Sequence, residues 1–164
     1  IAAAKDVGLV EIANDNAPGQ IVVSGAADAV DKAICEAKAA GLRRAIKLPV
    51  SAPFHCGLMA PAAQVMREAL AASPIKDAKM PVFCNVTAAA ETSAEKLSVN
   101  LVKQVTARVR WRETLLAMRV AGCQSFIELG TGKVLSGLVK RSLGDVRVAN
   151  LDGPDDLDSV VAEL

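Results

Sequence analysis

The chain has 164 residues, of which 52% are hydrophobic, so it is long enough to bury the core of a globular domain. Lys and Arg number 19 and Asp and Glu number 18, and this balance gives no electrostatic reason to expect a nucleic acid or a membrane as partner. No apolar run approaches the roughly 20 residues of a transmembrane helix. Residues 1–10 lack the basic region of a signal peptide, so we expect no targeting segment there.

The first third of the chain predicts a small subdomain over residues 1–49. Residues 1–7 resemble the end of a helix that stops at Gly8, and two strands at 10–13 and 20–25 are joined by turn-forming residues 14–19. Helical spacing follows from residue 30 to a stop at Gly41, and residues 44–48 predict a third strand. Helix–strand–strand–helix–strand is the ferredoxin-like pattern without its first strand. The uncovered strand edges lead us to expect a fragment, or a covering segment elsewhere.

The remainder, residues 50–164, predicts helices alternating with strands. The expected helices cover residues 58–73, 93–105, 111–122, 134–143 and 154–164. The expected strands cover residues 81–86, 125–129 and 146–150, with a loop at 87–92. This alternation favours a parallel sheet flanked by helices.

The four cysteines are widely spaced and form no C-x-x-C pair: Cys35, Cys56, Cys84 and Cys123. Two disulfides would also fit an even count, but we expect four reduced thiols that pack as small apolar side chains, as in a cytoplasmic enzyme. With a single histidine and no cysteine cluster, we expect no zinc site.

His55 is the only histidine, and it lies in a segment, residues 48–59, that begins with a strand-like apolar run and is followed by a helical pattern. Histidine is the default candidate for proton transfer near neutral pH. A ring held at the end of a strand is well placed to face a cleft in an α/β sheet, although a lone histidine is more often a packed structural residue. The adjacent Cys56 should point to the opposite face, so we do not expect a Cys–His dyad.

Three segments resemble motifs of a known family. Residues 50–63 resemble a histidine motif, and residues 14–25 an N-x-N-[SA]-P-G-Q-x-V-x-[SA]-G segment. Residues 128–135 resemble an E-[VL]-G-P-G-K-V-L loop, with Thr131 in place of the usual proline. Together, and in this order, they resemble the malonyl-CoA:acyl-carrier-protein transacylases, the acyltransferases of fatty-acid synthesis. The resemblance implies an α/β fold, with an incomplete ferredoxin-like small subdomain at 1–49 and part of an α/β-hydrolase-like parallel sheet with helices at 50–164.

Members of this family use a serine on a G-x-S-x-G turn as nucleophile, and that pattern is absent from this sequence. In the family the serine, the oxyanion loop and the arginine for the malonyl carboxylate lie upstream. The resemblance is therefore to a C-terminal portion, inactive alone, whose partners would be malonyl-CoA, acyl carrier protein and a missing N-terminal segment. The implied reaction moves malonyl from coenzyme A to the serine and then to the carrier's phosphopantetheine thiol, with no metal or redox cofactor.

The resemblance also implies roles for individual residues. His55 matches the general base, which takes the serine proton and returns it to the leaving thiol. Gln104 matches a glutamine whose backbone carbonyl binds the other ring nitrogen, or it is an ordinary helix residue. Asn14 and Asn16 match residues near the acyl thioester and pantetheine, or they are simple turn formers.

Three further residues carry weaker expectations. Phe54 matches a position where phenylalanine often accompanies malonyl selectivity and serine methylmalonyl selectivity; otherwise it only packs the subdomain junction. Arg43 and Arg44 resemble a basic pair for docking the acidic carrier protein, or are ordinary surface charges. Residues 130–133 lack the spacing of a phosphate loop and predict a structural turn near the site.

Two alternatives to this function stay open. A non-catalytic acyltransferase-derived domain that binds carrier protein or a partner chain would also fit the sequence. Within the enzyme class, a different acyl thioester is the main alternative.

Overall fold

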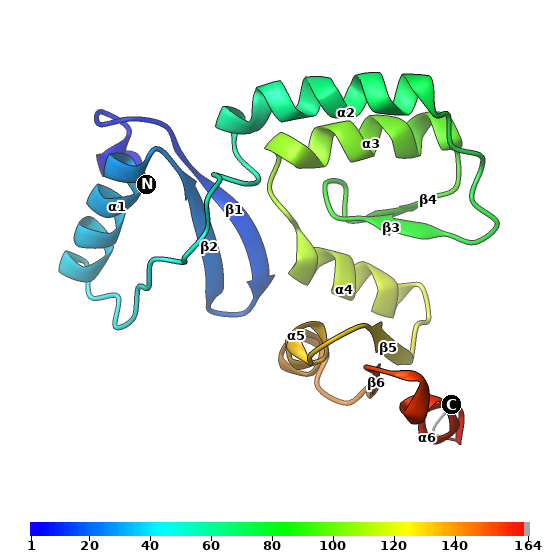
Figure 1. Ribbon diagram of the computed structural model, residues 1–164. Coiled ribbons are helices and arrows are strands. Elements are labelled where there is room, and N and C mark those ends of the chain that lie inside the picture. Colours follow the sequence, from blue (N-terminus) through cyan, green and yellow to red (C-terminus); the bar gives the residue numbers. More distant parts are fainter. Residues whose placement is uncertain (163–164) are drawn as a thin grey trace.

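The structure is a computed structural model that describes residues 1–162, and it has a mixed α/β fold (Figure 1). Its elements are, in order, η1 (Ala2–Ala4), β1 (Val10–Ala17), β2 (Gln20–Gly25), α1 (Ala27–Ala39), η2 (Gly57–Met59), α2 (Ala60–Ala72), β3 (Val82–Cys84), β4 (Ala89–Glu91), α3 (Ala94–Thr106), α4 (Trp111–Val120), β5 (Ser125–Leu129), α5 (Val134–Leu143), β6 (Arg147–Leu151), η3 (Pro154–Asp156) and α6 (Leu157–Ala162), where η marks a 3-10 helix.

Strands β1 and β2 form the predicted hairpin, but β1 is longer than expected. The strands pair antiparallel from Val10–Gly25 to Ala17–Gln20, and Gly19 closes the turn with a φ of 74°, which favours glycine. The prediction of a turn at residues 14–16 is wrong, because these residues belong to β1. Alternate residues of this part of β1, Ala13 and Asp15 among them, are buried, as a half-covered strand requires.

Helix α1 packs on the hairpin through small side chains. Ala4, Val10, Ala29 and Ala33 are the buried residues of this cluster. The predicted helix end at residues 1–7 is only the short η1 turn. This small core holds β1 in place as one wall of the cleft described below.

Residues 40–56 connect α1 to η2 without a helix or strand, so the predicted strand at residues 44–48 is wrong. Ile46 and Leu48 are 59% and 52% exposed. Apolar content alone does not make a strand, since a strand also needs a neighbour to pair with. Lys47 ties the segment to α1 through an ion pair of 2.9 Å with Asp31. The strand-like run expected before His55 is therefore irregular chain.

Helices α2 and α3 lie side by side, above the short antiparallel pair β3–β4 in Figure 1. The predicted helix at 93–105 is confirmed, and Ser93 caps it by accepting a hydrogen bond from the Lys96 backbone N–H at 3.5 Å. The loop predicted at 87–92 is partly wrong, because Ala89–Glu91 form β4.

The predicted parallel sheet is only partly correct: β5 and β6 pair in parallel, with α5 connecting them, whereas β3 pairs antiparallel with β4 in a separate sheet. Glu128 accepts hydrogen bonds from the backbone N–H groups of Leu135 and Ser136, at 3.0 and 2.7 Å, and so caps α5. Hydrogen bonds from Ser136, and to a smaller extent the one from Leu135, hold the pKa of Glu128 below its usual value. The last predicted helix is present as α6; residues 163–164 of that prediction lie outside the described residues.

All four cysteines are free, as expected, with Cys35 exposed and Cys56 and Cys84 buried. Of the described helices, none has both the length and the apolar character to cross a membrane.

Candidate active site

His55 lies just before η2, in a left-handed backbone conformation with a φ of 61°. This conformation is uncommon for a residue other than glycine, and it persists only where surrounding contacts hold it. The ring is half-buried, and its Nδ1 lies 2.8 Å from the backbone carbonyl oxygen of Gln104. Two residues 49 positions apart in the sequence are thus joined at one point.

This contact determines which ring nitrogen carries the proton. A carbonyl oxygen can only accept a hydrogen bond, so Nδ1 must be the donor. In the neutral ring Nε2 is then unprotonated and free to accept a proton. Gln104 lies in the last turn of α3, where carbonyl oxygens have no partner within the helix, so its carbonyl is available to the ring. His55 is therefore held in the tautomer of a general base.

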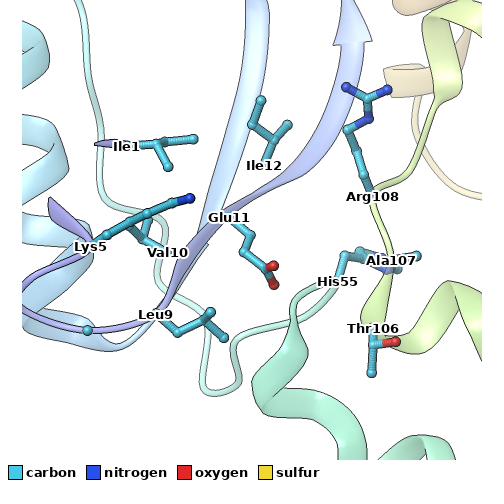
Figure 2. Close-up of a pocket in the computed structure, with 11 residues that line it drawn as sticks. Ile1, Lys5, Leu9, Val10, Glu11, Ile12, His55, Thr106, Ala107 and Arg108 are labelled. Carbon is cyan, nitrogen blue, oxygen red and sulfur yellow. The ribbon is translucent and has the colours of Figure 1, made fainter. Parts of the chain in front are cut away.

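His55 borders a cleft with a volume of 730 Å³ between β1 and the α3–α4 connection (Figure 2). Residues 8–12 form one side, and His55 with residues 106–108 forms the other; Ile1 and Lys5 complete the lining. In Figure 2 the His55 side chain lies beside Ala107, while the Glu11 side chain extends from β1 into the space between β1 and His55. The cleft is large enough for an elongated ligand to reach the imidazole.

Two neighbours of His55 make their own hydrogen bonds. The Gly57 backbone N–H donates to Glu11 Oε2 at 2.8 Å. The buried Cys56 thiol donates to the Pro53 carbonyl oxygen at 3.1 Å. The thiol is thus engaged away from the ring, which agrees with the expectation that Cys56 and His55 form no dyad.

A salt bridge fastens β1 to α4. Arg112 donates from Nε to Asp15 Oδ1 at 3.0 Å and from Nη2 to Asp15 Oδ2 at 2.8 Å, and Asp15 is only 5% exposed. The hydrogen bond from Arg112 lowers the pKa of Asp15 despite the burial of the carboxylate. Backbone hydrogen bonds between Asp15 and Val109, at 2.9 Å, and between Val109 and Ala13, at 2.8 Å, run alongside. This junction fixes the two walls of the cleft relative to each other.

The other predicted site residues lie outside the cleft lining. Asn14 and Asn16 are half-buried in β1, on either side of Asp15. Phe54 is 53% exposed, and its ring centre is 6.5 Å from that of His55. Arg43 and Arg44 are exposed in the irregular segment 40–56.

The loop at residues 130–133 is a turn, as predicted. Gly130 and Gly132 have φ values of 118° and 95°, and Asn150 Nδ2 donates to the Gly132 carbonyl at 2.7 Å. The Glu128 carboxylate already occupies the N-terminus of the helix that follows, which is where a phosphate would bind. No cluster of His, Cys, Asp or Glu suited to a metal ion occurs among residues 1–162.

No protein-family model matches the chain. A curated relative does: the malonyl CoA-acyl carrier protein transacylase of Bacillus subtilis is 42% identical over 156 residues, which are 95% of this chain and 49% of that protein. The resemblance to the malonyl CoA-acyl carrier protein transacylases is confirmed. The chain spans about half the length of the curated transacylases it matches.

Solved structures of transacylases also superpose on this chain. The malonyl CoA-acyl carrier protein transacylase of Clostridium perfringens superposes with a TM-score of 0.94 at 38% identity, covering 99% of this chain and 51% of that one. A malonyl-transacylase in complex with a type II PKS acyl-carrier protein gives a TM-score of 0.93 at 36% identity, covering 99% of this chain and 54% of that one. The mixed α/β fold is thus similar to about half of each of these transacylase structures.

Proposed function

We propose that these residues form the histidine-bearing half of a malonyl-CoA:acyl-carrier-protein transacylase. The serine nucleophile would lie in a part of the protein outside this sequence. The observation that carries the proposal is the 2.8 Å contact between His55 Nδ1 and the Gln104 carbonyl, which leaves Nε2 as a base beside an open cleft. Similarity to transacylases over 95% of the chain supports it.

The proposed mechanism uses His55 twice. Nε2 takes the proton of the serine hydroxyl as its oxygen attacks the thioester carbon of malonyl-CoA. The carbon–sulfur bond then breaks, and His55 returns the proton to the leaving coenzyme A thiolate. In the second half the phosphopantetheine thiol gives its proton to Nε2 and attacks the malonyl-serine, and the serine oxygen recovers the proton. Gln104 stabilises the imidazolium formed in both halves.

The substrates would be malonyl-CoA and the phosphopantetheine thiol of acyl carrier protein. Coenzyme A thioester and phosphopantetheine are substrates here, and the chemistry needs no metal or redox cofactor. Asn14 and Asn16 would lie near the acyl thioester and pantetheine, and Phe54 would limit the size of the acyl group. Such an enzyme of fatty-acid synthesis would work in the cytoplasm.

Arg43 and Arg44 would dock the carrier protein. They are exposed, and within residues 1–162 neither forms an ion pair. Two uncompensated positive charges on one exposed segment suit an acidic partner, chiefly by speeding encounter.

The proposal extends to the two subdomains of the chain. Residues 1–49 would form an incomplete ferredoxin-like subdomain, and residues 50–164 part of an α/β-hydrolase-like core. Parallel strands are normally buried on both faces, yet Leu129 on β5 is 73% exposed. Val134, the first residue of α5, is 71% exposed. Further strands and helices from the N-terminal segment of the same protein would cover them.

The test compares the longer protein with the 164 residues alone. The longer protein should transfer malonyl from malonyl-CoA to holo acyl carrier protein, whereas the 164 residues alone should not, because they lack a G-x-S-x-G serine. Transfer by the 164 residues alone would refute the proposal. A longer protein that binds carrier protein without transferring malonyl would instead support the non-catalytic alternative.

A further inference from the structure

The Glu11 side chain connects β1 to the turn that carries His55. Glu11 Oε2 accepts the Gly57 backbone N–H at 2.8 Å, and Gly57 follows His55 by two residues. Figure 2 shows the Glu11 side chain directed into the cleft that His55 borders. Glu11 lies outside the three sequence motifs described above.

The turn around His55 needs such support. Its φ of 61° is a strained backbone conformation for histidine, one that neighbouring contacts must hold in place. On one side the ring is bound to the Gln104 carbonyl of α3. On the other side Glu11 of β1 binds the backbone of Gly57. The base is thus held between two elements that belong to opposite walls of the cleft.

Gly57 lies close against β1. A Cβ at this position would come within 3.3 Å of Leu9 Cδ2 and 3.6 Å of Glu11 Oε2. The backbone of the turn therefore lies close to the side chains of Leu9 and Glu11, and a small change in the length of residue 11 would alter the contact.

We propose that Glu11 is a positioning residue for the general base. Its carboxylate oxygen holds Gly57, and through Gly57 it keeps His55 in the left-handed conformation that brings Nδ1 to the Gln104 carbonyl. Glu11 acts as a hydrogen-bond acceptor of the right length, and its negative charge is secondary. The kinetic consequence rests on the proposed transacylase function, whereas the effect on the imidazole tautomer does not.

This role predicts which substitutions of Glu11 keep the wild-type kcat and which lower it. Glu11→Gln keeps an acceptor oxygen at the same reach, so it should stay within about threefold of the wild-type kcat. Glu11→Asp keeps the charge but withdraws the carboxylate by about 1.5 Å, so it should lower kcat by about ten- to hundredfold, as should Glu11→Ala. Because the substitutions act through the position of the imidazole, the loss should appear mainly in kcat and less in KM. Glu68→Ala, at an exposed glutamate of α2 outside the cleft lining, is the control and should change nothing.

The experiment uses the full-length protein and two readouts: malonyl transfer kinetics, and the ¹⁵N signals of the His55 ring assigned against His55→Ala. We expect wild type, Glu11→Gln and Glu68→Ala to keep the Nδ1–H tautomer, and Glu11→Asp and Glu11→Ala to lose it. Wild-type tautomer and rate in Glu11→Asp, or a Gln variant as impaired as the Ala variant, would overturn the proposal. If Glu11→Ala does not fold, the Gln and Asp variants decide. If the wild type transfers no malonyl, the proposed function fails, while the tautomer still tests Glu11.

Discussion

The Nδ1 of His55 and the backbone carbonyl oxygen of Gln104 lie 2.8 Å apart, and the contact joins the irregular segment before η2 to the last turn of α3. In many histidine-dependent enzymes a carboxylate fills the place of this carbonyl. A neutral carbonyl also accepts the Nδ1 proton and orients the ring, but its place depends on the position of the helix rather than on a side chain.

Replacing Gln104 by Ala should therefore have little effect. The carbonyl remains when the side chain is removed, so kcat/KM for malonyl transfer should stay within about twofold of the wild type. Steady-state kinetics of the full-length protein with malonyl-CoA and holo carrier protein make the measurement. A loss of about a hundredfold or more would mean that the Gln104 side chain itself contacts a substrate.

Phe54→Ser should shift acyl selectivity. The ring lies beside the imidazole, with centres 6.5 Å apart, and forcing a branching methyl against it costs on the order of 1–3 kcal/mol. Removing the ring should move the ratio of kcat/KM for methylmalonyl-CoA to that for malonyl-CoA upward by about tenfold or more. An equal loss for both substrates would assign Phe54 to packing only.

Arg112→Leu should destabilise the fold by about 1–3 kcal/mol at neutral pH, because it leaves the buried Asp15 carboxylate without its charged partner. Arg119→Leu, at an exposed arginine of the same helix, is the matched control and should cost much less. Urea unfolding of the full-length variants measures both. Equal stability of the two variants would show that the Asp15–Arg112 pair contributes nothing.

The effect of Arg112→Leu should also depend on pH. The pKa of Asp15 is lowered in the folded protein, so the pair stabilises the fold above the unfolded pKa of about 3.9, and this stabilisation is lost as pH falls through the lowered value. The stability difference between wild type and Arg112→Leu should therefore narrow below about pH 4. If the stability difference between wild type and Arg112→Leu did not change with pH, the lowered pKa of Asp15 would be contradicted.

Thiol reactivity should separate the cysteines. Cys35 is exposed on α1, whereas Cys56 is fully buried and donates to the Pro53 carbonyl, so a thiol reagent should modify Cys35 long before Cys56. Peptide mapping after brief alkylation of the native protein measures this, and Cys35→Ser is the control. Early modification of Cys56 would mean that the turn around His55 opens readily.

Local patterns were sufficient to predict several elements. The strand at 125–129 and the helix at 134–143 have the predicted bounds, because apolar periodicity and the glycines beside them mark both ends. The pairing of His55 with Gln104 was expected only from the family resemblance, since no local pattern indicates which carbonyl a ring will meet.

The features that local sequence patterns do not predict depend on contacts between residues far apart in the sequence. The run at 44–48 has strand-forming residues but no strand to pair with, while residues 14–16 look like a turn but continue β1 beside Val109. The Asp15–Arg112 pair spans 97 positions, and Glu11 meets Gly57 across 46. Such contacts follow from the packing of β1 against α4 and η2, which no short window of sequence contains.

The most direct test of the account is single-turnover malonylation of the full-length protein, with His55→Ala compared against wild type and Gln104→Ala. Because a nucleophile and its base act as a unit, losing the imidazole should slow formation of the malonyl-serine by at least about a thousandfold, while Gln104→Ala stays near the wild-type rate. A His55→Ala protein that is malonylated within about tenfold of the wild-type rate would contradict the assignment of His55 as the general base.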